Sequence, residues 1–119
     1  MFWWKKKRKA ITEPELSKEE IEELVAENIK FAKIYAHHGN VSGMEMALEI
    51  IMKYGRRIDK SLASDEIAEI KLMGYERGAK LMRQSAIKLK NEGKINEANN
   101  AEMLAESYAG EALILKQTL

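Results

Sequence analysis

The sequence of 119 residues contains no cysteine and a single proline. Without cysteine, the chain has no disulfide framework, no thiolate nucleophile and no zinc–thiolate site. It also lacks the run of about 18 apolar residues that a membrane-spanning helix needs. The N-terminus does not have the order of a secretion signal, because its aromatic residues precede its basic ones. We therefore expect a cytoplasmic protein that is at most peripheral to a membrane or part of a larger assembly.

The residues that are present favour helix. Hydrophobic residues make up 45% of the chain and charged residues 33%, as in an ordinary globular protein, and the length fits one domain. Glu, Lys, Ala, Leu, Ile and Met are abundant, and all six are common in helices. We expect an all-α fold, either a four-helix bundle or a pair of packed helical hairpins. An extended N-terminal arm and linker would occupy residues 1–16, and the bundle residues 17–119.

Capping signals place the beginnings of two helices. Ser17 and Glu20 have the spacing of a capping box, and Ser42 and Glu45 repeat it. In such a box the hydroxyl accepts from a backbone amide while the carboxylate accepts from the amide of the cap residue. Together with the signals below, these boxes predict four helices at about 18–38, 43–58, 64–91 and 95–116.

Glycine and serine mark the remaining boundaries. Gly39, followed by Asn40, supplies the left-handed residue that ends a helix, and Gly93 marks a second break. Ser61 or Ser64 is the expected cap of the third helix. Because the connections are short, we expect sequential helices to be antiparallel.

Apolar residues recur at three- and four-residue steps on the first two helices, which predicts faces that pack into a core. Asn28 interrupts the first of these stripes, either as a buried polar residue or as an edge position. The two stripes are Ile21, Leu24, Val25, Ala32 and Tyr35, and Met44, Ala47, Leu48, Ile51, Tyr54 and Ile58.

Small residues gather on the third and fourth helices. Gly74 and Gly78 lie on the apolar stripe of the third helix, although each glycine costs a helix about 1 kcal/mol relative to alanine. Small side chains let two helices approach toward the close end of the usual separation of about 8–10 Å. We therefore expect these glycines to face a row of alanines across a tight hairpin. The alanines are Ala98, Ala101, Ala105 and Ala109.

The fourth helix also has a second apolar side, formed by Leu104, Tyr108 and Leu115. A simple bundle needs only one apolar face on each helix. The extra side indicates either a central helix buried on several sides or a surface that another chain covers. Self-association, or binding of a protein partner, is accordingly expected.

No arrangement of catalytic or metal-binding residues is found. His37 and His38 are adjacent on a helix, so they point about 100° apart and are unsuited to sharing a metal ion. No serine has a histidine at an informative spacing, and no Glu-x-x-His pattern of a di-metal site occurs. We expect no enzyme activity, no cofactor and no small-molecule substrate.

Two segments have the sequence of a helix end followed by a turn. The segment 31–40 resembles the end of the first helix and the turn of a tetratricopeptide repeat, and the segment 89–98 is similar. The two segments lie farther apart than tandem repeats of about 34 residues would place them. Ser85 and Glu102 also stand where that family has large apolar residues. The resemblance implies a helical hairpin that binds protein, without an array of repeats.

The N-terminal arm concentrates the positive charge of the chain. Five basic residues follow the aromatic residues Trp3 and Trp4, leaving 15 basic against 19 acidic residues elsewhere, a net charge of −4 outside the basic run. Attraction to an anionic surface must therefore come mainly from the arm. The basic run is Lys5, Lys6, Lys7, Arg8 and Lys9.

Two mechanisms of binding fit the arm. In the first, it docks on an anionic membrane surface or a neighbouring subunit, with tryptophan at the headgroup level and each cation contributing about 1 kcal/mol. In the second, it binds nucleic acid as part of an accessory or packaging protein, with Arg56 and Arg57 as candidate secondary phosphate contacts. A third interpretation is a solubilising tail, or one that folds back on the acidic stretch from Glu13 to Glu27. We expect a non-enzymatic helical interaction or assembly module whose arm docks on an anionic surface or a neighbouring subunit.

Overall fold

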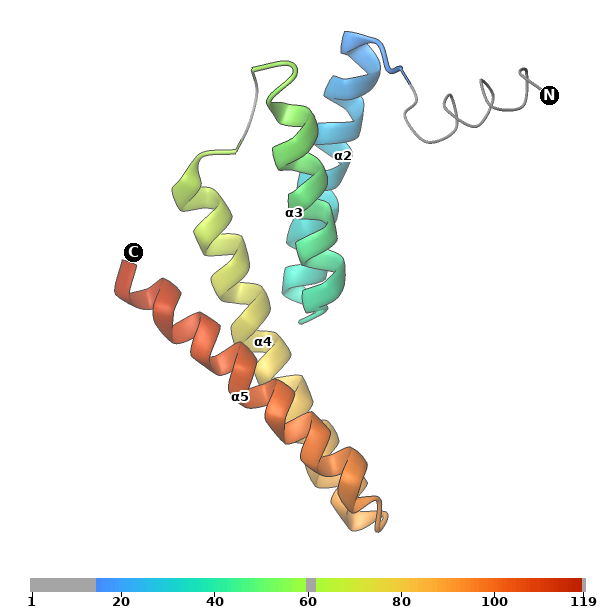
Figure 1. Cartoon of the computed structure of the whole chain (residues 1–119), viewed down its shortest axis with the longest axis vertical. Helices are drawn as coiled ribbons and strands as arrows, with labels where there is room; N and C mark the ends of the chain where they lie inside the picture. Colours follow the sequence, from blue (N-terminus) through green and yellow to red (C-terminus); the bar gives the residue numbers. More distant parts are fainter. Residues whose placement is uncertain (1–14, 60–61, 119) are drawn as a thin grey trace, which may run out of the picture.

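The computed structural model describes residues 15–59 and 62–118. Within these ranges, α2 pairs with α3 and α4 pairs with α5, so that the four helices form two antiparallel hairpins (Figure 1). The predicted all-α fold is therefore confirmed, in its form of two packed hairpins, and the predicted arm lies outside the described residues. The helices are α2 Lys18–His37, α3 Val41–Gly55, α4 Ser64–Asn91 and α5 Ile95–Thr118.

The first capping box and the first glycine break are as predicted. The amide of Glu20 donates to the Ser17 hydroxyl at 3.1 Å, and the amide of Ser17 donates to the Glu20 carboxylate at 3.1 Å. At the other end of α2, Gly39 has a left-handed φ of +72°. The chain reverses there, and the amide of Asn40 donates to the carbonyl of Tyr35 at 2.8 Å. These contacts fix both ends of α2.

The second predicted capping box is wrong. The cap of α3 is Asn40, whose side-chain oxygen accepts from the amide of Gly43 at 3.0 Å. Asparagine caps a helix at least as well as serine, so α3 begins at Val41, and Ser42 is already inside it. The carboxylate of Glu45, which the prediction assigned to the cap, accepts a hydrogen bond from α4 instead.

The boundaries between α3 and α4 also differ from the prediction. Helix α3 ends at Gly55, before the predicted end at Ile58, because the chain leaves helical geometry in a turn over residues 56–59. The cap of α4 is Ala63, whose methyl side chain cannot accept a hydrogen bond from the backbone amides of the first turn. Ser64 is the first residue of the helix instead of its cap, and Ser61 lies outside the described residues.

The core lies where the first hairpin packs on α4. Met44, Leu48 and Ile51 are the largest fully buried side chains, and all three come from α3. On α2, Ala32 and Ala36 are completely buried, which lets α3 and α4 approach that helix closely. Burying a large apolar side chain contributes about 1.5–3 kcal/mol. Helix α3 therefore supplies much of the stabilising burial, as its apolar spacing predicted.

The glycines of α4 face the first hairpin. A Cβ atom at Gly74 would collide with the sulfur of Met44 and lie 3.5 Å from the Cα of Ala36. A Cβ at Gly78 would lie 2.7 Å from the Val41 side chain and 3.2 Å from the carbonyl oxygen of Gly39. The two glycines thus make room for α2 and α3. The prediction that they face the alanine row of α5 is wrong for Gly74.

Alanines form much of the seam between α4 and α5, where Tyr108 of α5 also contacts Tyr75 of α4. On α4, Ala79 and Ala86 are 2% exposed, and they lie about 80–140° around the helix from the glycines. The described buried residues of α5 are Ala98, Ala101, Ala105 and Ala112. Small side chains therefore meet across this hairpin, with alanine on α4 taking the place that was predicted for glycine.

Three polar contacts add to the packing between and within the helices. The Tyr75 hydroxyl of α4 donates to the Glu45 carboxylate of α3 at 2.8 Å. Arg77 of α4 donates from Nη1 to the carbonyl oxygen of His37 at 2.8 Å and lies 2.8 Å from Nδ1 of the same residue. Asn28, buried on the apolar face of α2, donates from its side chain to the Leu24 carbonyl at 2.8 Å. The first two contacts connect the hairpins, and the third satisfies a buried amide within one helix.

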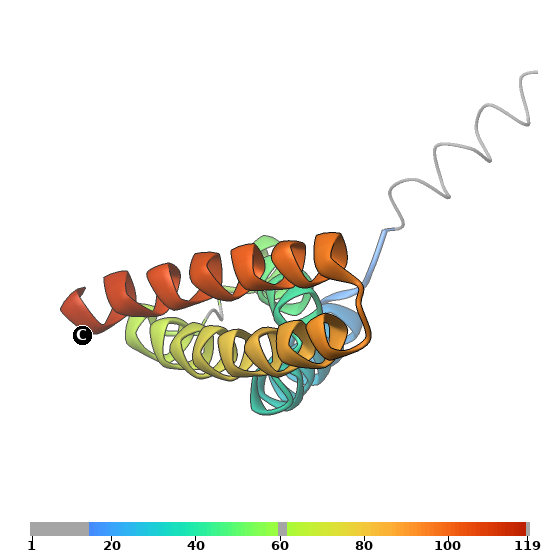
Figure 2. The ribbon, with the colours of Figure 1, turned by 90° about the horizontal axis from the view of Figure 1, so that it is seen from below.

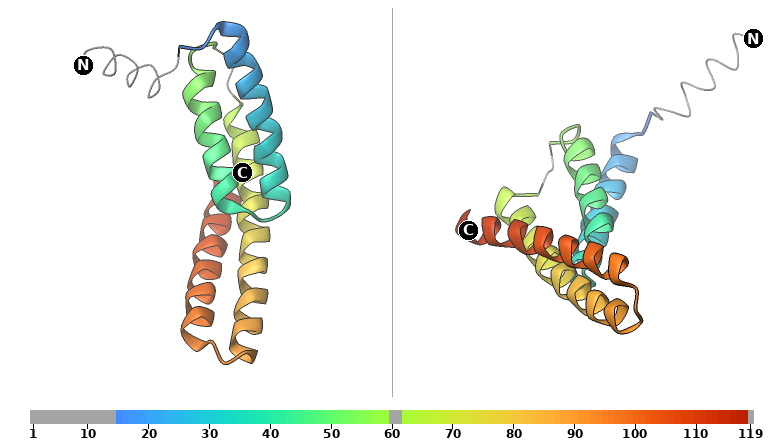
Figure 3. Two further views of the ribbon diagram at one scale, coloured as in Figure 1. Left: turned by 90° about the vertical axis from the view of Figure 1, so that its right-hand side faces the viewer. Right: turned by 60° about the horizontal axis from the view of Figure 1, so that its bottom comes forward.

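The second hairpin is longer than the first. Helix α4 has 28 residues and α3 has 15, lengths of about 42 and 22 Å at a rise of 1.5 Å per residue. The far end of α4 and α5 therefore projects beyond the first hairpin (Figure 1 and Figure 3, left). The two helices lie side by side (Figure 2). Among the described residues, the backbone of α5 lies beside α4 only. We call residues 82–104 the distal hairpin, and the region around Met44, Gly74 and Gly78 the junction.

Candidate functional site

Helix α5 exposes several of its large apolar side chains to solvent. Met103 is 67% exposed, Leu113 59% and Ile114 58%, whereas the buried residues of this helix are alanines. A helix that packs on a globular core usually buries its large apolar residues. The chain therefore leaves an apolar surface of α5 uncovered.

Part of this surface forms a stripe without charge. Six exposed residues recur at three- and four-residue steps along α5, which places them on one side of the helix. None of them is charged, although charged residues make up 33% of the chain. A Cβ at Gly110 would meet no atom within 4 Å, so the surface is open there. We call this stripe the uncharged face of α5: Asn96, Asn100, Met103, Ser107, Gly110 and Ile114.

Helix α2 carries a second exposed stripe, which has two parts. In its N-terminal half the stripe consists of carboxylates, and in its C-terminal half Phe31 and Ile34 are 43% and 45% exposed. The Phe31 ring lies 6.5 Å from the ring of Tyr35, which extends the apolar part. The members recur at three- and four-residue steps, and this spacing was the signal that sequence reasoning missed. We call the stripe the outer face of α2: Glu20, Glu23, Glu27, Phe31 and Ile34.

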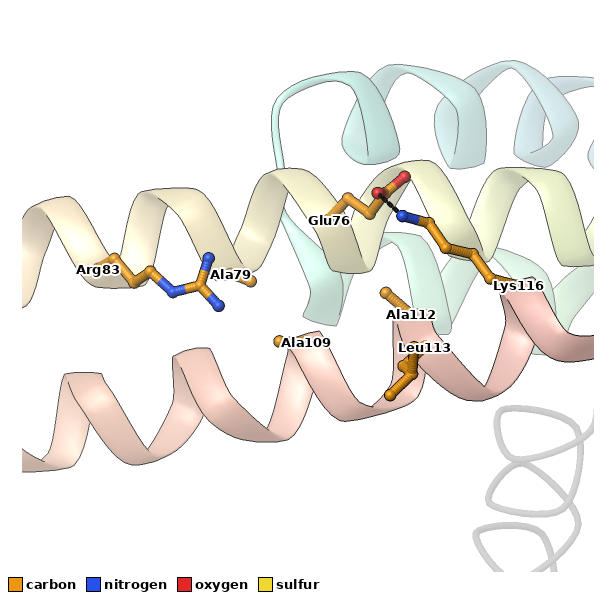
Figure 4. A pocket seen from close by; sticks show the side chains of 7 residues that line it. All are labelled: Glu76, Ala79, Arg83, Ala109, Ala112, Leu113 and Lys116. Carbon is orange, nitrogen blue, oxygen red and sulfur yellow. Dashed lines mark ion pairs between the residues drawn. The ribbon is translucent and has the colours of Figure 1, made fainter.

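An open groove runs between α4 and α5 (Figure 4). Its floor is made of alanine side chains, and the Glu76 carboxylate and the Lys116 ammonium pair across it at 2.9 Å. Both charged side chains are about half exposed, so the pair contributes little to stability. The groove also contains Arg83 and Leu113. The groove thus combines small, charged and apolar side chains.

A larger cleft of about 520 Å³ lies between α2 and α4. Ile70 and Met73 give it an apolar wall, and Lys33, Glu66 and Glu69 stand around it. His37 also lines the cleft, but its carbonyl and its Nδ1 both contact Arg77. His37 thus takes part in the packing of α2 on α4.

Tyr75 is the one group in the described ranges whose pKa departs clearly from its ordinary value. Burial raises the pKa of this hydroxyl, and its hydrogen bond to the Glu45 carboxylate raises it further. The residue is 7% exposed and lies 6.1 Å, ring to ring, from Tyr108. A tyrosine with a raised pKa keeps its proton and acts here as a hydrogen-bond donor between helices. Within residues 15–59 and 62–118, no three His, Asp or Glu side chains gather as metal ligands would.

The candidate residues for binding anionic surfaces are only partly described. Trp3, Trp4 and the basic run lie outside the described residues. Arg56 and Arg57 are exposed in the turn after α3, and Arg57 lies with its guanidinium carbon 5.1 Å from the centre of the Tyr54 ring. Lys53 approaches the same ring, at 5.4 Å. A small basic cluster thus surrounds Tyr54.

The candidate oligomer face divides into exposed and internal residues. Leu104 is 45% exposed, as a contact for another chain requires. Tyr108 and Leu115 are half-buried, and they pack against the core of their own molecule. These two side chains fit the alternative of a helix buried on more than one side, and the shared face stays a prediction for Leu104.

In the part of the chain that the structure describes, none of the helices has the length and apolar character to span a membrane. Comparisons with models of protein families, with curated proteins and with solved structures found no match. The features available for inferring a function are thus the exposed faces of α2 and α5 and the basic cluster at Tyr54.

Proposed function

We propose that this protein is a non-enzymatic helical assembly module that associates with itself or with a protein partner through α5. The observation that supports this most strongly is the exposure of Met103, Leu113 and Ile114, in a helix that otherwise buries alanine. Exposed apolar surface that another chain could cover is a feature of protein interaction sites. The N-terminal arm would then attach the assembly to an anionic surface.

The uncharged face of α5 suits contact with another helix. Binding a charged side chain in an interface requires its desolvation, so a face without charge avoids that cost. Ser107 and Gly110 lie between the larger Met103 and Ile114, and small residues let a partner helix approach closely. Self-association is the simplest form of the proposal, because it requires no component beyond this chain.

The arm suits an anionic surface because it is strongly basic, whereas the rest of the chain has a net negative charge. The five cations of the arm precede a remainder with 15 basic and 19 acidic residues. Near an anionic membrane each lysine or arginine contributes about 1 kcal/mol, so the attachment would be reversible and sensitive to salt. An assembly presenting several arms would bind more strongly than a single chain.

Nucleic acid is the alternative target, and the basic cluster at Tyr54 favours it. Lys53 and Arg57 approach the Tyr54 ring, and Arg56 is exposed beside them. These cations could add phosphate contacts to those of the arm. The membrane proposal makes no use of this cluster, so the two candidates can be separated by substitution at Arg56 and Arg57.

Light scattering tests the α5 interface. In the proposed assembly, Met103→Ser with Ile114→Ser lowers the mass of the particle toward that of a single chain. The matched control is Met46→Ser with Ile87→Ser, because these side chains are 66% and 62% exposed on other helices. The control should keep the mass of the wild type. A wild-type protein that stays monomeric at every concentration would contradict self-association, and equal effects of both pairs would contradict the assignment to α5.

Binding measurements across salt concentrations test the arm. The full chain is compared with a chain lacking residues 2–9, using anionic vesicles, neutral vesicles, DNA and RNA. We expect the full chain to bind anionic vesicles and the shortened chain to lose that binding. Binding to nucleic acid alone, weakened by Arg56→Gln with Arg57→Gln, would select the alternative. Equal binding by both chains would remove the arm from the proposal.

A further inference from the structure

The outer face of α2 and the N-terminal arm have matching chemistry. The outer face presents a row of three carboxylates followed by an exposed apolar part. The arm contains five cations next to an aromatic segment, Phe2 to Trp4. We propose that the arm of each chain docks on the outer face of its own α2, with the cations on the carboxylates and the tryptophans on Phe31 and Ile34.

The order of the residues supports docking within one chain. Starting from Ser17 and moving along α2, the carboxylates come first and the apolar residues second. Moving from Ser17 in the opposite direction, toward the N-terminus, the cations come first and the aromatic residues second. An arm that folds back antiparallel to α2 therefore places each part beside its complement. Residues 10–16, which include Pro14, are available for the reversal, and proline favours a turn there.

The distances agree as well. From the middle of the carboxylate row to the middle of the apolar part is about nine residues of helix, or about 13 Å at the helical rise. From Lys7 to Trp3, the middles of the two parts of the arm, is four residues, or about 13 Å for an extended chain. The same four residues in a helix would span only about 6 Å. The match thus requires an extended arm, laid along α2.

The exposed character of both parts of the face makes such docking reversible. Glu20, Glu23 and Glu27 are all exposed, and pairs between exposed charges are individually weak and screened by salt. Phe31 and Ile34 keep less than half of their surface in solvent, so they offer contact area without a deep pocket. An anionic surface would therefore compete with the carboxylates for the cations of the arm.

Docking would regulate the binding proposed above. An arm held on α2 is withheld from other anionic surfaces until one of them displaces it. This regulation rests on the proposed function, whereas the docking itself does not. Helix α2 then acts as an internal competitor, and weakening its carboxylate row should strengthen binding to anionic vesicles.

Tryptophan fluorescence measures the docking directly, because the two tryptophans of the chain are both in the arm. The test variant is Glu20→Gln with Glu23→Gln and Glu27→Gln in the full chain. Glutamine at position 20 can still serve in the capping box, so α2 should remain folded. The matched control is Glu97→Gln with Glu102→Gln and Glu106→Gln, which removes the same charge from α5.

We expect the wild type to show blue-shifted emission and slow quenching by acrylamide compared with a free peptide of residues 1–16. The carboxylate variant and high salt should both shift emission and quenching to the values of the peptide, while the control keeps those of the wild type. The wild-type values should not change on dilution. Emission like that of the peptide in the wild type, or equal loss in the control, would overturn the proposal, and a dilution dependence would overturn docking within one chain.

A second variant tests the apolar part of the face. Phe31→Ser with Ile34→Ser leaves every charge in place and changes two exposed side chains. Its emission should be red-shifted to that of the free peptide, whereas Met46→Ser with Ile87→Ser should keep the emission of the wild type. A failure of both the wild type and the carboxylate variant to bind vesicles would contradict the proposed function while leaving the fluorescence result, and with it the docking, intact. Unchanged emission in the Phe31 and Ile34 variant would contradict the predicted position of the tryptophans.

Discussion

The junction and the distal hairpin are built from the same helix, α4, but they are packed differently. At the junction, Met44 is completely buried, and its sulfur fills the space beside Gly74 of α4. In the distal hairpin the buried residues are alanines, and Ile87 and Met103 are more than 60% exposed. A buried alanine removes far less apolar area from water than a buried methionine or isoleucine. The stability of the fold therefore resides mainly in the junction.

The difference also separates stability from function. Residues at the junction are occupied with one another, so a substitution there changes folding first. The exposed apolar residues of α5, such as Met103 and Ile114, contact little of their own chain, so a substitution there changes surface chemistry with a small effect on stability.

Met44→Ala should destabilise the protein most. The side chain is fully buried, and replacing a buried large apolar residue by alanine costs about 2–5 kcal/mol. Leu104→Ala, in the distal hairpin, removes a side chain that is 45% exposed and should cost much less. Urea denaturation monitored by circular dichroism measures both. Similar losses for the two variants would show that the regions contribute equally.

Gly78→Ala should destabilise the junction despite the better helix propensity of alanine. The new Cβ would lie 2.7 Å from the Val41 side chain and 3.2 Å from a backbone oxygen. Overpacking of this kind costs about 1–3 kcal/mol. The midpoint of thermal unfolding provides the measurement. An unchanged or higher midpoint would mean that the two hairpins do not approach closely at this position.

Tyr75→Phe should cost about 1–2 kcal/mol, because it removes the hydrogen bond to the Glu45 carboxylate. Glu45→Gln keeps an acceptor at the same position and should cost less. Chemical denaturation of both variants and of their combination yields the coupling between the two residues. A coupling near zero would remove this contact from the account of the junction.

The same tyrosine predicts a loss of stability at alkaline pH. Burial and the hydrogen bond raise the pKa of Tyr75 in the folded protein above that of the unfolded chain. The folded protein thus holds this proton more tightly, so its contribution is complete below about pH 10 and declines as the pH rises further. Denaturation at pH 8 to 11 should show a decline that is smaller in Tyr75→Phe. Equal declines in both proteins would assign the effect to other groups.

At protein concentrations where the chain is monomeric, Gly110→Ala should give the smallest change, and it should be stabilising. No atom lies within 4 Å of the position of a Cβ at this residue, and alanine is favoured over glycine inside a helix by about 1 kcal/mol. Together with Gly78→Ala, this variant applies the same chemical change to the two regions. A thermal midpoint below that of the wild type would indicate that the uncharged face of α5 is already in contact with another chain.

Much of the fold could be predicted from local signals. The capping box at Ser17, the glycine breaks at Gly39 and Gly93 and the apolar stripe of α3 each depend on a few neighbouring residues. Errors arose where two local solutions compete. Asn40 and Ser42 are both good caps, and the choice between them depends on the turn that Gly39 makes.

The partners of each helix face could not be predicted in the same way. A stripe of small residues on α4 indicates that another helix packs closely against it, but the spacing of these residues does not identify that helix. Gly74 meets Met44 of α3, while Ala79 faces the alanines of α5. Likewise, the apolar character of Tyr108 was visible in the sequence, but its contact with Tyr75 depends on how α4 and α5 pack side by side.

Amide hydrogen exchange tests the division between the two regions most directly. Amides that open only by global unfolding exchange slowly, and those that open locally exchange faster. We expect the amides of α3 from Met44 to Ile51 to exchange at the rate of global unfolding. Those of the distal hairpin, around Ala86 and Ala101, should exchange faster through local opening. Equal protection of α3 and the distal hairpin would contradict the account, because the alanine seam would then contribute as much as the core at the junction.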